Sequence, residues 1–279
     1  MTSAGAPPAP TASGSWRGTT AFWWLALSAL AIAVFAPLPY LTSSLRELAS
    51  NDSGLADNYV DRAMWVRAAL YVHIVGGGVA LALSPLQFAR RLRSRAPRLH
   101  RVVGRVAFGA IAVGGVAGLV IAPVNEAGLV GVAGFGALGV LWLWFAWRAY
   151  RAIRTGDVGA HRRWAVRTFA MTYAAVMLRL WLGVLIGAQI GLLGTADDLA
   201  FDRAYLLVPF LCWVPNLIVA ERRLARTPTR TGVHQRPRHG EPVVENGSVV
   251  ERQRWVPRSS PRQVGAPTGS QAPSPGRQV

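Results

Sequence analysis

Two histidine–arginine pairs stand where charged stretches of the chain give way to apolar ones. His100 lies in LHRVVGR and His161 lies in AHRRWAVR, and each is followed about one helical turn later by a further arginine, Arg105 or Arg167. Two neutral imidazoles that face each other can hold a haem iron from both sides, and nearby arginines can pair with the haem propionates. The alternative is that these side chains lie among lipid headgroups and anchor the start of a helix.

A second set of polar residues lies inside apolar runs. Arg179 stands about 20 Å from the cytoplasmic end of its segment, at a rise of ~1.5 Å per residue. An arginine there costs at least ~2.5 kcal/mol, so its side chain should face the bundle interior, a wet cavity or a partner. The expected spans hold no carboxylate, so an ion pair would come from an outer loop, for example from Asp61 or Asp197. The alternative is that Arg179 reaches outer carbonyls or headgroups.

His73 and Thr172 complete this set. His73 lies near the outer end of its apolar segment, at a depth similar to that of Arg179, and Thr172 shares a helical face with Arg179. We therefore predict one outward-facing ligand pocket lined by His73, Arg179 and Thr172, with an anion site at Arg179. The alternative for His73 is a hydrogen bond to a backbone carbonyl in a packed bundle.

The elements that position these residues are apolar segments. The chain is 52% hydrophobic and only 15% charged, which is too apolar for an ordinary soluble domain. Most segments have the roughly 17–25 residues that a bilayer-spanning helix needs, and the last carries two prolines and is the shortest. We predict an all-α, polytopic integral membrane bundle of about six transmembrane helices, over residues 20–41, 68–89, 102–124, 129–147, 165–190 and 204–220.

The composition divides the chain into three parts. Residues 1–16 are predicted to be a disordered cytoplasmic N-terminus, residues 17–225 a six-span transmembrane domain, and residues 226–279 a disordered cytoplasmic tail rich in proline and arginine. The first apolar run is longer than the ~7–15 residues of a signal-peptide core, so we interpret it as a membrane anchor.

The charge pattern predicts the orientation. The net charge is +17, and arginines crowd the second and fourth connections while acidic residues occupy the alternate ones. Arginine-rich loops stay in the cytoplasm, so both termini are expected on the cytoplasmic side of the inner membrane. The partners we expect are the lipid bilayer and anionic headgroups at the arginine-rich loops, and no nucleic acid. The aromatic residues that we expect at the two membrane interfaces are Trp23, Trp24, Tyr40, Trp65, Trp142, Trp144, Trp147, Trp164 and Tyr205.

Two sets of glycines predict close helix packing. Gly114 and Gly118 form a small-xxx-small pair, and Gly183, Gly187 and Gly191 repeat at four-residue spacing. In lipid, such spacing lets helix backbones approach closely.

Several kinds of chemistry are missing from the sequence. The single cysteine, Cys212, excludes an internal disulfide and a cysteine-based metal cluster. No zinc-ligand spacing, phosphate-binding loop or nucleophile elbow occurs, so we predict no metal site and no catalytic residue, and nothing in the sequence favours an enzyme. The oligomeric state is left open.

The stretch from about residue 68 to residue 221 resembles a bacterial family of multi-span membrane proteins, domain of unknown function 2306. The resemblance rests on YVHIVGGG followed by SPLQFARRLRSRAPRLHRVVGRV, on GDVGAHRRWAVRTFAMTYAAVMLRLWL, and on CWVPNLIVAE. The resemblance implies that the chain lies in the membrane and singles out a set of residue positions, and it brings no assigned activity. A looser similarity links LHRVVG to the LHxxxG helix starts of di-haem transmembrane cytochromes, although this chain lacks their second histidine pair.

These observations predict an integral inner-membrane protein of unassigned activity that binds a small ligand or partner through intramembrane Arg179 and His73. The alternative is a b-type haem protein in electron transfer, with His100 and His161 as the two iron ligands. A small-molecule transporter is a weaker alternative, because the sequence shows no matched pair of broken helices and no buried carboxylate.

Overall fold

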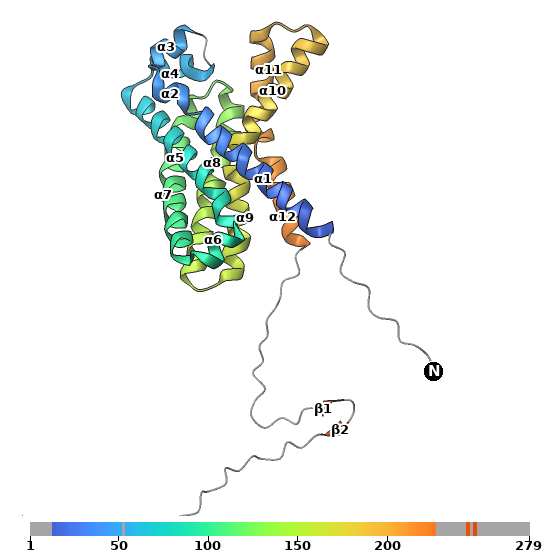
Figure 1. The fold of residues 1–279 in the computed structure, drawn as a ribbon. Coiled ribbons are helices and arrows are strands. Elements are labelled where there is room, and N and C mark those ends of the chain that lie inside the picture. The colour runs from blue at the N-terminus through green and yellow to red at the C-terminus, as the bar shows by residue number, and fades with distance from the viewer. Residues whose placement is uncertain (1–12, 52–53, 227–243, 246–247, 250–279) are drawn as a thin grey trace, which may run out of the picture. The chain divides into compact units, whose positions relative to one another are not determined.

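The computed structural model describes residues 13–51, 54–226, 244–245 and 248–249. Within them, six helical stretches are long and apolar enough to cross a membrane, and they pack into a bundle (Figure 1). The predicted all-α membrane bundle of about six spans is therefore confirmed. Most of the two segments predicted to be disordered, residues 1–16 and 226–279, lies outside the described residues.

The six spans correspond to the six predicted apolar segments, with longer bounds. The elements of the bundle are α1 (Ser13–Phe35), α2 (Leu38–Thr42), α3 (Leu45–Ser50), η1 (Gly54–Ala56), α4 (Asp57–Val60), α5 (Met64–Phe88), α6 (Arg90–Arg95), α7 (Pro97–Ile121), η2 (Ala122–Val124), α8 (Gly128–Arg154), α9 (Val158–Thr172), α10 (Ala174–Leu193), α11 (Asp197–Leu211) and α12 (Val214–Ala225). The separate C-terminal unit contributes two short antiparallel strands, β1 (Val244–Glu245) and β2 (Ser248–Val249).

The last span differs most from its predicted bounds. It runs over Asp197–Ala225 instead of 204–220, so Asp197 and Asp198 form the first turn of α11 rather than part of a loop. Acidic side chains are favourable in that position because they face the positive end of the helix dipole. The second proline of the span, Pro215, stands at the start of α12, where its missing N–H leaves no helical bond unmade.

Three of the six spans are interrupted, and the first of these breaks between α1 and α2. The fifth span breaks at Tyr173, between α9 and α10, and the sixth breaks between α11 and α12. The side-chain amide of Asn216 donates to the carbonyl oxygen of Ala170 at 3.2 Å and to that of Cys212 at 3.0 Å. One side chain thus satisfies a backbone acceptor at the breaks of the fifth and sixth spans, which a dry interior requires.

Glycines set the closest approach between helices. A Cβ at Gly76 of α5 would lie 2.9 Å from the Cα of Gly114 of α7, so the two backbones touch as the small-residue pattern predicts. The other glycine repeat behaves differently, because no atom lies within 4 Å of a Cβ built on any of its members. The expected packing along that repeat (Gly183, Gly187 and Gly191) is therefore wrong for this chain, and the repeat lies on a helix that leans away from the bundle with α11 (Figure 1).

The two ends of the bundle carry opposite charge. Figure 1 shows α6 and α12 at one end and α2, α3 and α4 at the other. Arginines gather at the first end, on α6, at the end of α8 and at the end of α12. Acidic residues gather at the second end, in the first turns of α3, α4 and α11.

Candidate functional site

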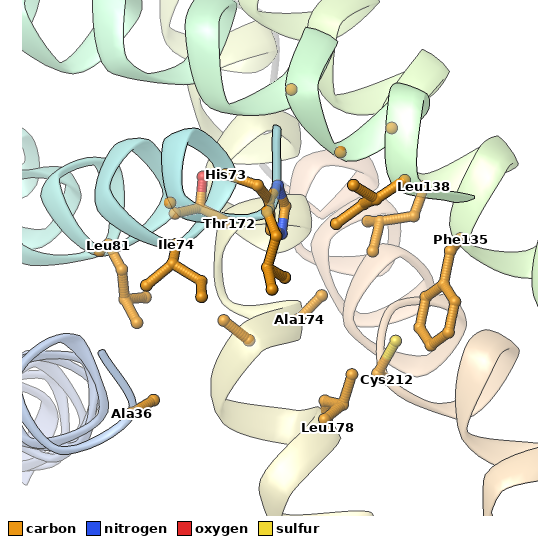
Figure 2. Close-up of a pocket in the computed structure, with 18 of the residues that line it drawn as sticks. Ala36, His73, Ile74, Leu81, Phe135, Leu138, Thr172, Ala174, Leu178 and Cys212 are labelled. Carbon is orange, nitrogen blue, oxygen red and sulfur yellow. The ribbon is translucent and has the colours of Figure 1, made fainter. Parts of the chain in front are cut away.

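A cavity of about 270 Å³ lies among α1, α5, α7, α8, α10 and α11. Its wall is largely aliphatic and aromatic, and Figure 2 shows His73 among the apolar side chains Ile74, Leu81, Leu138 and Phe135. Three polar residues that the sequence predicted to share a pocket (His73, Thr172 and Arg179) all line this cavity. Their role in binding a ligand stays a prediction.

His73 is held by the helix opposite its own. Its Nδ1 lies 2.8 Å from the carbonyl oxygen of Gly114, which matches the alternative of a histidine bonded to the backbone. Gly118, one turn further along α7, makes room for the ring, because a Cβ there would lie 2.8 Å from Nδ1. The other ring nitrogen, Nε2, has no hydrogen-bond partner among the described residues, so this nitrogen remains available to the cavity.

Arg179 lies at the edge of the cavity, and its side chain is exposed on the surface of the bundle. Its Nη1 donates to the carbonyl oxygen of Ala175 at 3.0 Å, within its own helix. No carboxylate of the described residues lies within ion-pair distance, so the ion pair with Asp61 or Asp197 that the sequence allowed is not formed. The guanidinium instead lies near His73 and near the side chains of Tyr40, Tyr205 and Cys212.

Thr172 supports the wall of the cavity. Its hydroxyl donates to the carbonyl oxygen of Thr168 and accepts from Nε1 of Trp142, both at 2.9 Å. Because the hydroxyl hydrogen is used, Thr172 can offer a ligand only an acceptor. Trp142 is 7% exposed and belongs to the core, so its prediction as an interface aromatic is wrong.

Three tyrosines that line the cavity were missed as site residues. Tyr40 and Tyr205 were predicted to mark the membrane interface, but Tyr205 is 6% exposed and lines the cavity beside Tyr59. The position of Tyr205 could have been found from its spacing with Val208 and Cys212, which places all three on one face of a helix. Tyr59 belongs to a short helix outside the spans and carries no such signal.

Glu126 and Asp57 lie near these tyrosines outside the spans, and Asp202 lies near them at the start of the sixth span. Burial, and then the nearby charges of Asp202 and Asp57, raise the pKa of Glu126. Burial likewise raises the pKa of Tyr59. The end of the site nearest the acidic residues therefore places a carboxyl group with a raised pKa close to phenol groups, and Glu126 forms no ion pair with Arg179.

His100 and His161 lie at the arginine-rich end and are near enough to interact electrostatically. His161 places its Nδ1 2.9 Å from the carbonyl oxygen of Ala149 and packs edge-on against Phe108, with ring centroids 6.5 Å apart. Phe108 also packs against Tyr150. These contacts place aromatic side chains beside His161, while Nδ1 of His100 is buried without a hydrogen-bond partner among the described residues. Haem ligation by the two histidines stays a prediction.

Of the two arginines expected to pair with haem propionates, Arg105 and Arg167, the second is already engaged. Arg167 donates from Nε and Nη2 to the two carboxylate oxygens of Glu221, at 2.6 and 2.7 Å. Its guanidinium also lies over the ring of Trp164, 4.6 Å from the centroid, and the guanidinium of Arg148 lies over the same ring at 4.7 Å. Arg167 therefore joins α9 to α12.

Comparison with known families gives one match. The family model described as "Predicted membrane protein (DUF2306)" matches residues 70–223, which is more than half of the chain and includes all five candidate residues. No curated protein and no solved structure matches the chain.

Proposed function

Since the chain belongs to the DUF2306 family of predicted membrane proteins, we propose that it is a membrane-embedded binding protein for a small amphiphilic ligand with an anionic head. One observation carries this proposal: a single largely apolar cavity contains both Arg179, a cation without a carboxylate partner among the described residues, and His73.

The charge of Arg179 is the first argument. A cation in apolar surroundings is unfavourable unless a counter-charge and hydrogen bonds compensate it. Its own helix supplies one acceptor, the carbonyl of Ala175, which leaves most of the guanidinium donors for a ligand. A carboxylate matches these donors in charge and geometry.

The wall of the cavity is the second argument. Beyond the polar groups, it consists of side chains such as Leu70, Ile74, Leu138 and Leu178, which favour an apolar ligand body. The volume of about 270 Å³ lies just below the ≈ 300–1,000 Å³ of most small-molecule pockets, so the ligand is small.

The orientation follows from the charges at the ends of the bundle. We infer that residues 17–225 form the membrane domain, with the arginine-rich end in the cytoplasm, as the positive-inside rule expects for an inner-membrane protein. Both termini are then cytoplasmic and the cavity lies in the outer half of the bilayer. The arginines of α6 and α8 meet anionic lipid headgroups. No described contact favours haem binding or transport, and neither is proposed.

The test is calorimetry with octanoate and its neutral analogue octanamide, on protein in lipid nanodiscs. Octanoate should bind at concentrations where octanamide does not. Arg179→Gln should abolish the difference, whereas Arg203→Gln, which changes an outward-facing arginine of α11, should leave it intact. Equal binding of the two probes, or unchanged octanoate binding by the Arg179→Gln protein, would overturn the proposal.

A further inference from the structure

We propose that the ligand also carries a hydrogen-bond donor, separate from its anionic head, and that Nε2 of His73 accepts from it. This inference rests on the proposed function, because it concerns the same cavity. It narrows the ligand to hydroxy acids with an apolar body.

The hydrogen bond to Gly114 fixes which nitrogen of His73 carries the proton. A carbonyl oxygen can only accept, so Nδ1, 2.8 Å away, must be the donor. In a neutral imidazole the other nitrogen then has a lone pair and no hydrogen. His73 therefore presents an acceptor at Nε2.

The neighbourhood of His73 favours the neutral ring. Arg179 already places one positive charge within electrostatic reach of His73, and no carboxylate of the described residues forms an ion pair with either side chain. A second positive charge in the same apolar cavity would repel the first and lose hydration. His73 thus serves as a neutral acceptor, while Arg179 supplies the cation.

Among the described residues, this acceptor has no hydrogen-bond partner. Figure 2 places the His73 ring among Ile74, Leu81, Leu138 and Ala174, which offer no side-chain donor. The hydroxyl of Thr172 is already committed to Thr168. An unpaired acceptor in such surroundings loses free energy that a ligand hydroxyl would restore.

The two polar side chains therefore call for two different groups on one molecule. Arg179 recognises an anion, His73 recognises a donor, and the apolar part of the cavity wall accommodates a hydrocarbon body. A simple fatty acid satisfies the first requirement only, and an alcohol the second only.

The experiment compares three acids by calorimetry on wild-type protein in nanodiscs: octanoate, 8-hydroxyoctanoate and 8-methoxyoctanoate. The methoxy acid retains the oxygen but has no hydrogen to donate. We expect 8-hydroxyoctanoate to bind about tenfold more tightly than either of the others, the effect of one buried hydrogen bond. Equal affinity of all three acids would overturn this inference and leave the anion site standing. Failure of all three to bind would overturn the proposed function itself.

Two variants assign the effect to His73. His73→Phe keeps a ring but removes the acceptor, so the preference for the hydroxy acid should disappear. His73→Gln should retain a preference, because its amide can donate to Gly114 while its oxygen accepts from the ligand. A preference that survives in the Phe variant, or that is lost in a folded Gln variant, would contradict the assignment. If the Phe variant does not fold, the wild-type and Gln measurements still decide whether the ligand hydroxyl donates to residue 73.

Discussion

The side-chain nitrogen of Asn216 lies 3.2 Å from the carbonyl oxygen of Ala170, and this contact joins the interruption of the sixth span to that of the fifth. The same nitrogen donates to Cys212. Thr172 and Cys212, which lie at or next to these contacts, line the cavity. Asn216 therefore fixes the relative position of the two helix breaks that contribute to the cavity wall.

Replacing Asn216 should therefore loosen the protein. Asn216→Leu keeps the volume but leaves two carbonyls without this donor, and each unsatisfied acceptor costs about 1–3 kcal/mol. We expect a clear fall in the thermal unfolding temperature in detergent and weaker octanoate binding. An unfolding temperature equal to that of the wild type would show that the two interruptions are held by other contacts.

Gly118 and Gly109 lie on the same helix, α7, so alanine substitutions at these two positions form a test variant and its control. A Cβ at Gly118 would press on the His73 ring, whereas a Cβ at Gly109 meets no atom within 4 Å. Gly118→Ala should destabilise the protein by about 1–3 kcal/mol through overpacking and should weaken binding of 8-hydroxyoctanoate. Gly109→Ala should leave binding unchanged and raise stability by up to about 1 kcal/mol through helix propensity. Equal behaviour of the two variants in thermal unfolding and calorimetry would argue against a tightly held His73.

The bidentate pair of Arg167 with Glu221 should contribute modestly to stability. The Glu221 side chain is 45% exposed, so solvent or headgroups screen the interaction. A double-mutant cycle with Arg167→Gln and Glu221→Gln should give a coupling of about 1 kcal/mol that shrinks at high salt. The readout is thermal unfolding at low and high salt. A coupling of zero at low salt would show that α9 and α12 are joined mainly by apolar packing.

Glu126 should make stability depend on pH. Its folded-state pKa is raised above the usual 4.5 by burial and by Asp202 and Asp57, so the folded state holds its proton more tightly than the unfolded state does. The carboxyl then contributes no penalty below about pH 4.5, and stability falls as pH rises through the raised pKa. Glu126→Gln should raise the unfolding temperature at pH 7.5 and make no difference at pH 4. A variant that is no more stable than the wild type at pH 7.5 would contradict this account.

The sequence predicts the six spans because the length of an apolar run is a direct consequence of bilayer thickness. It misplaces the start of the last span because helices extend past the apolar region, through Asp197, where hydropathy gives no signal. The fifth span breaks at Tyr173 in a stretch without proline or glycine, and the contact at that break comes from Asn216 on a distant helix. The sequence alone therefore does not predict this break, and the structure shows it.

The candidate site was also predicted only in part from the sequence. Depth counted along helices brings His73 and Arg179 to a common level, and the structure places both at one cavity. The burial of Trp142 could have been predicted from its spacing with Gly139 and Ala146, which defines one helix face. Tyr59 reaches the cavity from a short helix outside the spans, which no periodic pattern indicates.

The central claim is that a small anionic amphiphile occupies the cavity between His73 and Arg179. The most direct measurement is photolabelling of the protein in nanodiscs with octanoate that carries a terminal diazirine, followed by peptide mass spectrometry. The account predicts label on cavity residues such as Ile74 and Leu138, loss of that label with excess octanoate, and its loss in the Arg179→Gln protein. Label confined to outward-facing residues such as Leu192, unaffected by octanoate or by the substitution, would contradict it.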